Sequence, residues 1–125
     1  MIDISYIERA NMAKKKLSPL PAAAFQILLA LVGEDLHGYA IMRTVAEQTG
    51  GRMRLGPGTL YGSIRVLLEE KLIEEVDGLE ESKTKRRRYY KLSPTGRKLV
   101  RAEAERLADL LRVARAKNVL RGDYV

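Results

Sequence analysis

The side chains best suited to chemistry in this chain are basic ones gathered in a short stretch. Residues 83–98 contain eight Lys or Arg residues and no acidic residue, whereas residues 69–81 contain seven acidic residues and one lysine. Ammonium and guanidinium groups bind phosphate oxygens, and neutralising the phosphates of a polyanion releases counterions. The whole chain has 23 Lys and Arg against 16 Asp and Glu, a formal charge of +7. These features favour a polyanionic partner and an affinity that falls with salt.

The residues needed for most enzymatic and metal chemistry are missing from the sequence. Without cysteine there is no disulfide, thiolate nucleophile or zinc thiolate site, and one histidine, His37, cannot form a multi-histidine metal cluster. No GxxxxGK or GxGxxG phosphate-binding motif occurs either. The neighbouring carboxylates of Glu69 and Glu70 point to different faces of a helix, so they make a poor acid and base pair. We therefore expect no enzymatic activity, no cofactor and no metal, and we interpret His37 as a residue that starts a helix.

Helical spacing dominates the first half of the chain. Pro21 suits the first turn of a helix, Gly33 ends that helix, and a glycine pair at 50–51 ends a second one. A Pro-Gly pair at 57–58 predicts a turn, after which Thr59 is expected to cap a third helix. The predicted helices span residues 22–31, 37–48 and 59–71.

The pattern then changes to that of strands. Two short strand-like runs, 72–76 and 86–92, are joined by a charged segment, which predicts a hairpin with a long tip. Alternation along the second run directs Tyr90 toward the core. Ser93 and the proline after it are a start signal for a last helix, which is predicted over 95–118.

Length and composition favour a single domain that does not enter a membrane. The 125 residues, 46% of them apolar, suffice for one hydrophobic core. The longest apolar stretch, 20–32, is shorter than the roughly 20 residues that a membrane-spanning helix needs. In residues 1–16 the basic run follows the apolar residues, which is the reverse of a secretory signal. We therefore expect a cytoplasmic protein with no membrane partner.

Four motifs support a more specific interpretation. They are HGYA at 37–40, PGTLYGSI at 57–64, EEKLIEE at 69–75 and RRRYYKLSPTG at 86–96. Their order and spacing resemble those of the PadR family of transcriptional regulators, although Gly62 stands where that family commonly has proline and Ile64 where leucine is usual. The resemblance implies a mainly α (α+β) fold, a winged helix-turn-helix with a long C-terminal dimerisation helix. The corresponding parts are an N-terminal segment with helical spacing (1–16), a DNA-binding domain (17–92) and a dimerisation helix (93–125).

The third helix is the element expected to meet DNA bases. At 100° per residue its leucines and Ile64 share one face, whereas Gly58, Gly62 and Arg65 point away. Small outward residues let a helix backbone approach the bases of a major groove, and Arg65 can pair with guanine or grip a phosphate. The resemblance implies that Tyr61 contacts a phosphate, and the hairpin tip adds basic side chains. The predicted DNA-binding residues are Thr59, Tyr61, Gly62, Ser63, Arg65, Lys83, Lys85 and Arg86.

The last helix carries an apolar stripe with a heptad pattern. Its members are spaced by four, three, four and three residues, which suits pairing with another helix. A twofold homodimer would present two third helices about 34 Å apart to a near-palindromic site on double-stranded DNA. The predicted dimerisation residues are Val100, Ala104, Leu107, Leu111 and Ala114.

These predictions describe a sequence-specific DNA-binding regulator. The resemblance implies a homodimeric repressor that responds to a small aromatic or hydrophobic effector, and no effector-binding residue is identified. The main alternative is a winged-helix module that binds protein or RNA without operator specificity. Three plainer interpretations also stay open: a solvated outer face on the third helix, pairing of the basic hairpin residues with Glu74 and Glu75, and folding of the apolar stripe onto its own domain.

Overall fold

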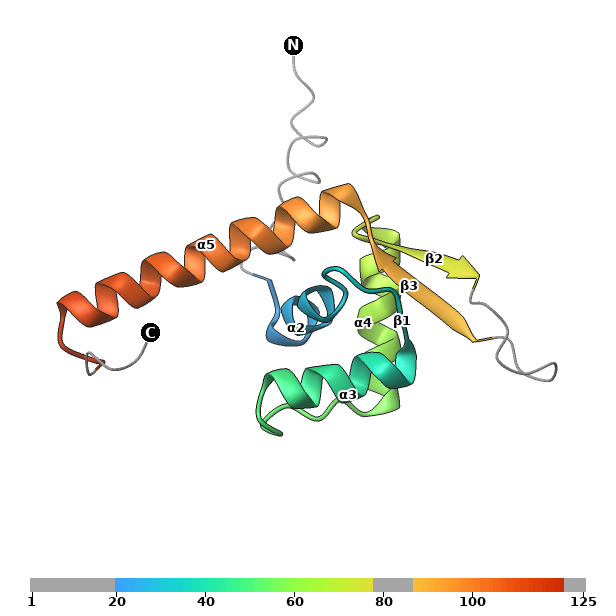
Figure 1. The fold of residues 1–125 in the computed structure, drawn as a ribbon, viewed down its shortest axis with the longest axis horizontal. Helices are drawn as coiled ribbons and strands as arrows, with labels where there is room; N and C mark the ends of the chain where they lie inside the picture. Colours follow the sequence, from blue (N-terminus) through green and yellow to red (C-terminus); the bar gives the residue numbers. More distant parts are fainter. Residues whose placement is uncertain (1–19, 78–86, 121–125) are drawn as a thin grey trace, which may run out of the picture.

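A computed structural model describes residues 20–77 and 87–120 of the chain, and its element order is that of a winged helix-turn-helix followed by a long helix (Figure 1). The fold class predicted from the sequence is therefore confirmed. The helices are α2 (Ala22–Ala30), α3 (Gly38–Gln48), α4 (Pro57–Glu69) and α5 (Pro94–Ala116), and the strands are β1 (Leu36–His37), β2 (Ile73–Asp77) and β3 (Arg88–Leu92).

The three strands form one small antiparallel sheet in the order β1-β3-β2. The predicted hairpin is present, with Ile73 opposite Leu92 at its base. Strand β1 was not predicted, because two residues are too short to show any alternation of apolar and polar side chains. Its Leu36 lies opposite Tyr90, so β1 ties the entry of α3 to the hairpin.

Helix α2 lies at the centre of the core, as its apolar character on nearly every side predicts. Ile27 and Leu28 are fully buried, and they belong to one cluster with residues of α3, α4, the hairpin and α5. Gly33, with φ of +78°, adopts the left-handed conformation after the helix, which explains why the helix ends there. Within the described residues, no helix combines the length and the apolar character that crossing a membrane requires.

Helix α4 begins two residues earlier than the sequence indicated, and this corrects the predicted cap. Gly56 is the N-cap residue and Pro57 occupies the first turn, where its fixed φ fits a helix and its missing N–H costs nothing. The Pro-Gly pair at 57–58 is therefore the start of the helix rather than a turn before it. Thr59 lies inside the first turn with its side chain exposed and makes no capping bond.

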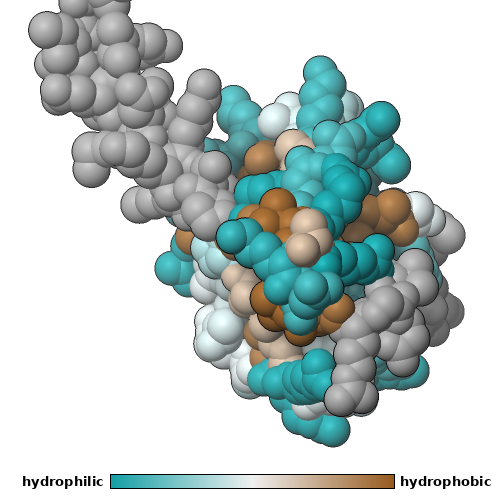
Figure 2. Space-filling model, turned by 90° about the vertical axis from the view of Figure 1, so that its left-hand side faces the viewer, coloured by the Kyte–Doolittle hydropathy of each residue, from teal (hydrophilic) through white to brown (hydrophobic). Residues whose placement is uncertain are grey.

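Helix α5 is joined to the end of α4 through Ser93. The Ser93 hydroxyl accepts a hydrogen bond from the Gly96 N–H at 3.0 Å, as the predicted start signal requires, and donates one to the Lys71 carbonyl at 2.8 Å. At 23 residues, α5 is about 35 Å long. Only its first turns cover the core, and its C-terminal turns extend beyond the rest of the fold (Figure 1). Figure 2, which views the molecule from that protruding side, shows apolar surface at several places between hydrophilic residues.

Candidate nucleic-acid interface

Helix α4 presents a narrow and open face to solvent. Its buried residues are the apolar ones predicted from the helical period, Leu60, Ile64 and Leu67. Gly58, Gly62, Arg65 and Thr59 are exposed, and Ser63 is half-buried. A Cβ atom added at Gly58 or Gly62 would meet no other atom within 4 Å. The backbone of α4 is therefore open to close approach over its first two turns.

Tyr61 lies on the flank of α4, over the start of α3. It is half-exposed, and a Cβ atom added at Gly38 would stand 2.6 Å from its hydroxyl oxygen. The glycine of the HGYA motif therefore leaves the space that Tyr61 occupies. The residue before it, His37, is the N-cap of α3, and its Nδ1 accepts a hydrogen bond from the Ala40 N–H at 3.2 Å. The interpretation of His37 as a residue that starts a helix is confirmed.

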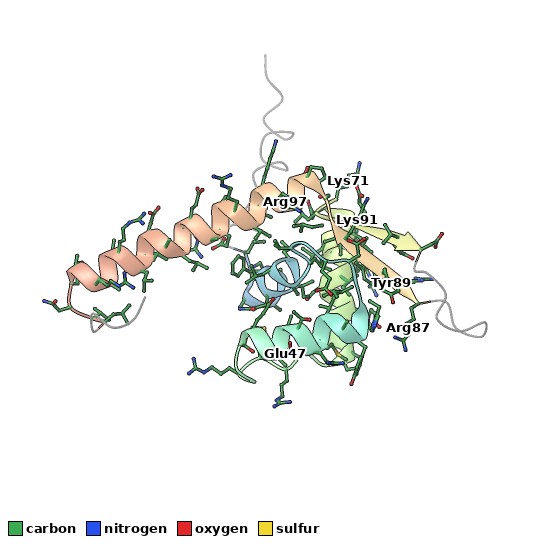
Figure 3. The ribbon with its side chains drawn as sticks, in the orientation of Figure 1. Glu47, Lys71, Arg87, Tyr89, Lys91 and Arg97 are labelled. Atoms are coloured by element: carbon green, nitrogen blue, oxygen red, sulfur yellow. The ribbon has the colours of Figure 1, made fainter. Side chains whose placement is uncertain are left out.

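The base of the hairpin brings a guanidinium group to the same place. Arg87 precedes β3, and its Nη1 lies 3.2 Å from the Nε2 of His37 (Figure 3). The rings of Tyr89 and His37 form an edge-to-face pair with centroids 5.4 Å apart, and the Tyr39 ring stacks on the His37 ring at a centroid distance of 6.5 Å. A shallow hollow of about 450 Å³ is lined by His37, Tyr39, Tyr61 and Arg87. A guanidinium group and phenol hydroxyls thus converge beside the first turns of α4, and such donors suit a phosphate group.

Tyr90 closes the inner side of this hollow. It is buried, as strand alternation predicts, and burial raises the pKa of its phenol above the ordinary value, with the Glu75 carboxylate raising it further. The hydroxyl is a hydrogen-bond donor at neutral pH, as an ordinary phenol is, and the raised pKa extends this to higher pH.

The basic run of the sequence divides into parts with different surroundings. Arg88 pairs with Glu75 at 3.4 Å and Lys91 with Glu74 at 3.5 Å, so the alternative of pairing within the hairpin holds at these two positions. Arg97 lies on the first turn of α5, and β3 separates it from Arg87 (Figure 3). The predicted tip residues, Lys83, Lys85 and Arg86, lie outside the described residues.

The predicted stripe on α5 also divides into two parts. Val100 is 6% exposed within the single chain, so its side chain is already covered by its own core. The stripe thus folds onto its own domain at this position. Ala104 is exposed, Leu107 is 41% exposed, and Leu111 and Ala114 are half-buried. Leu110 and Val113, which the heptad pattern did not include, are exposed by about half.

The family model of PadR-like transcriptional regulators matches residues 27–102, from the middle of α2 into α5. This chain belongs to the PadR-like family. The family is one of transcriptional regulators, and membership confirms the resemblance seen in the four motifs.

One curated relative and several solved structures are similar to this chain. An uncharacterized 37.1 kDa protein in transposon Tn4556 of Streptomyces fradiae is 42% identical over 88 residues, which are 70% of this chain and 24% of that protein. The chain thus spans about a quarter of that relative. A transcriptional regulator from Clostridium thermocellum, Cth-833, is 27% identical with a TM-score of 0.63, over 74% of this chain and 89% of that one.

Two further structures show the same fold at lower identity. A PadR family regulator from Clostridium difficile R20291 is 24% identical with a TM-score of 0.68, over 77% of this chain and 97% of that one. The Bacillus subtilis PadR solved in complex with operator DNA is 20% identical with a TM-score of 0.58, over 65% of this chain and 45% of that one.

The residues that sequence reasoning missed in this interface are Arg87 and Tyr39. Both lie in motifs that the sequence analysis singled out, but nothing in the sequence indicates that the start of α3 meets the base of the hairpin. Strand β1 creates this meeting, because it pairs His37 with Tyr89. A two-residue strand gives no periodic signal, so only the folded chain shows the contact.

Proposed function

We propose that this chain is a sequence-specific DNA-binding repressor that acts as a homodimer. One observation carries the proposal: the open, small-residue face of α4 adjoins the hollow formed by Tyr61, His37 and Arg87. The first surface suits the base edges of a major groove, and the second suits the phosphates that flank it. Occupying a promoter in this way would exclude RNA polymerase.

The roles of the residues follow from their chemistry. Gly58, Gly62 and Ser63, with Thr59 beside them, let the α4 backbone approach the bases. Arg65 pairs with a guanine or grips a phosphate, and the Tyr61 hydroxyl donates to a backbone phosphate. Arg87 adds a second donor, a charged one, to that phosphate. We further propose that Lys83, Lys85 and Arg86 bind the backbone without regard to sequence.

In this proposal two copies of the chain pair through helix α5. Its exposed apolar residues, Leu107, Leu110 and Val113, would be covered by a second copy, together with Leu111 and Ala114. Residues 17–92 would then form the DNA-binding domain and 93–125 the dimerisation helix, with 1–16 as a separate N-terminal segment. A twofold dimer with α4 helices about 34 Å apart suits a near-palindromic operator. The fold shared with a regulator solved on its operator DNA supports this arrangement.

A cytoplasmic location and relief of repression by a small aromatic or hydrophobic effector complete the proposal. A repressor must reach the chromosome, and it must be released from its operator when the regulated genes are needed. The exposed apolar surface on α5 is compatible with an effector that binds between two copies.

Binding to the DNA upstream of the chain's own coding sequence tests the proposal. Fluorescence anisotropy over a salt series should give binding that survives an excess of unrelated DNA at physiological salt. Lys85→Ala combined with Arg86→Ala should weaken binding to all sequences alike and reduce the salt slope by about two. Arg65→Ala should instead reduce the preference for the operator, if it pairs with guanine.

Arg101→Ala is the matched control, because it removes one positive charge from an exposed position on α5 that pairs with Glu105. It should leave both affinity and slope nearly unchanged. Loss of all binding under competitor DNA would favour the alternative, a winged-helix module for protein or RNA.

A further inference from the structure

A second pair of basic side chains lies at the end of α3 that points away from the hairpin. The segment between α3 and α4 carries Arg52 and Arg54, both exposed, and leads into the N-cap of α4 at Gly56. In Figure 1 the start of α3, next to β1, faces the hairpin, and this segment leaves from the opposite end. Neither arginine belongs to the four motifs or lines the hollow that contains Arg87. The pair is therefore separate from the donors already assigned to a phosphate.

The turn that carries these arginines is held in place by Thr49. Its hydroxyl donates a hydrogen bond to the Val45 carbonyl at 2.9 Å and accepts one from the Met53 N–H at 3.0 Å. The Gly51 N–H donates to the Ala46 carbonyl at 2.7 Å. These bonds fix the backbone of the turn against the last turn of α3. A fixed backbone lowers the entropy that is lost when the side chains bind a partner.

Gly51 also determines where one guanidinium group lies. A Cβ atom added at this glycine would stand 3.3 Å from the Nη2 atom of Arg54, so that side chain folds back toward the end of α3. Neither Arg52 nor Arg54 makes an ion pair with a residue that the structure describes, and Glu47 on the last turn of α3 pairs with neither (Figure 3). Two guanidinium groups against one carboxylate leave this end of α3 positively charged, with donors that suit an anion.

The length of α3 separates this site from the hollow. Arg87 contacts His37, the N-cap of α3, whereas the turn begins at Thr49, its C-cap. The 11 residues of α3 make it about 16 Å long. The major groove of B-form DNA is about 12 Å wide, and phosphates of opposite strands form its two edges. Basic groups at the two ends of α3 therefore suit phosphates on the two edges of one groove.

We propose that Arg52 and Arg54 bind the phosphate backbone across the major groove from the phosphate held at Arg87, so that α3 bridges the groove while the first turns of α4 enter it. The inference rests on the proposed function and adds to it a contact with the opposite strand. Thr49 is a positioning residue in this arrangement, because it holds the turn without touching DNA. Contacts on both strands fix the depth and the register of α4, as phosphate contacts do in protein–DNA complexes.

Removal of the two charges is the first test. Arg52→Gln with Arg54→Gln should weaken binding to the operator and to an unrelated duplex at least about tenfold, and should reduce the salt slope by about two for each bound chain. The matched control, Lys98→Gln with Arg101→Gln, removes the same charge from exposed positions on α5. It should leave affinity and slope nearly unchanged. Equal losses in the two double variants would show only a general charge effect and would refute the site.

A purely structural role of the arginines gives a different result. Basic side chains near the C-terminal end of a helix interact favourably with its dipole. In that role the Arg52 and Arg54 double variant would have a lower Tm, but its salt slope, measured well below the Tm, would equal that of the original chain. An unchanged slope would overturn the proposal whatever the change in Tm.

Thr49 is tested with two substitutions that leave both charges in place. Thr49→Val removes the hydroxyl and should weaken DNA binding about threefold, because the turn is no longer held against α3. Thr49→Ser retains a hydroxyl and should bind DNA like the original chain. If the two variants bound DNA equally well, Thr49 would have no positioning role.

Uncharged methylphosphonate linkages, placed one at a time in the operator, locate the contacts. A linkage at a phosphate bound by Arg52 or Arg54 should weaken binding of the original chain but not of the double variant. Arg87→Ala should be insensitive to a different linkage, which should lie on the other strand across the major groove. Two sensitive linkages on the same strand would refute the bridging arrangement.

The failure of this site and the failure of the proposed function give different results. A preference for the operator together with an unchanged salt slope in the Arg52 and Arg54 double variant would overturn this site alone. A reduced slope on every duplex, without any preference for the operator, would overturn the proposed function and leave the backbone site in place.

Discussion

Helices α4 and α5 both bury one face in the same core, but they differ in what the other face exposes. Over its first two turns α4 exposes glycine and threonine, with Tyr61 on its flank, whereas α5 exposes Leu107, Leu110 and Val113 over its C-terminal half. Small exposed residues leave space for a surface that must come close to the backbone. Exposed leucine and valine form an apolar surface that the described residues of the chain leave uncovered. Under the proposed function, this contrast corresponds to different partners for the two helices, a nucleic acid for α4 and a second copy for α5.

The glycines of the two helices repeat this contrast. Gly62 of α4 is surrounded by open space, whereas a Cβ atom at Gly96 of α5 would collide with the backbone carbonyl of Leu72. Glycine in α5 thus serves the packing of the chain on itself, whereas glycine in α4 leaves the helix backbone open to solvent. Four substitutions, taken from the largest expected effect to the smallest, test this difference.

Leu107→Glu should have the largest effect, because it puts a charge into the apolar surface that we assign to the dimer. A twofold interface would bury two such carboxylates, and we expect the dimer affinity to fall by at least about 100-fold. Sedimentation velocity would then detect monomers at concentrations where the original chain is dimeric. Glu105→Ala, at an exposed residue paired with Arg101, is the control and should remain dimeric. Dimers that persist in Leu107→Glu would remove α5 from the interface.

Gly96→Ala should destabilise the fold by about 2–3 kcal/mol, because the added methyl group meets a backbone carbonyl that cannot move away easily. Thermal unfolding should show a fall in Tm of about 10 °C. Gly58→Ala adds the same methyl group to the first turn of α4, where nothing is close, and should not lower Tm. A similar fall in Tm in both variants would mean that contact with the Leu72 carbonyl is not the cause of the destabilisation.

The faces of the helices could be predicted from the sequence because they depend only on local spacing. The 3.6-residue period separates Leu60 and Ile64 from Gly62, and the alternation of β3 buries Tyr90. The start signals of Ser93 and His37 are equally local, since each caps the helix that follows it.

Contacts between distant segments could not be predicted in this way. The heptad pattern of α5 continues through Val100 to Leu107, although the first packs inside its own domain and the second is exposed. Periodicity identifies which face is apolar but not what covers it. The same holds for Arg87 and His37, whose contact depends on how β1 pairs with β3 across 50 residues of sequence.

Gly62→Ala should affect stability and DNA binding in opposite directions. Alanine favours an exposed helix over glycine by about 0.5–1 kcal/mol, and the free chain has space for the methyl group, so Tm should rise. Under the proposed function, the same methyl group separates α4 from the bases and lowers operator affinity about tenfold, which anisotropy would measure. A higher Tm with unchanged affinity would contradict close approach of DNA at this position.

Glu103 marks the boundary between the covered and the exposed halves of α5. Its carboxylate is buried, accepts a hydrogen bond from the Arg106 side chain at 2.6 Å, and accepts another from the Leu20 N–H at 3.2 Å. The bond to Leu20 holds the entry of α2 against α5. The hydrogen bond from Arg106, more than the one from Leu20, lowers the pKa of Glu103 below its ordinary value, even though burial opposes this.

Glu103→Gln should therefore have the smallest effect of the four, and its effect should depend on pH. A lowered pKa in the folded state means that the ionised carboxylate stabilises the fold above the ordinary pKa of glutamate, and that this contribution is lost as the pH falls through the lowered value. At pH 7 the variant should lose about 0.5–1 kcal/mol of stability. The difference in Tm between the variant and the original chain should shrink as the pH approaches 3.

Glu105→Gln, at an exposed position, is the control, and its Tm should differ little from that of the original chain at every pH. If the Tm of Glu103→Gln and that of the original chain changed in parallel with pH, the ionised carboxylate would contribute nothing to stability. Apolar contacts such as those of Val100 would then hold α5 against α2 and set the boundary between its covered and exposed halves.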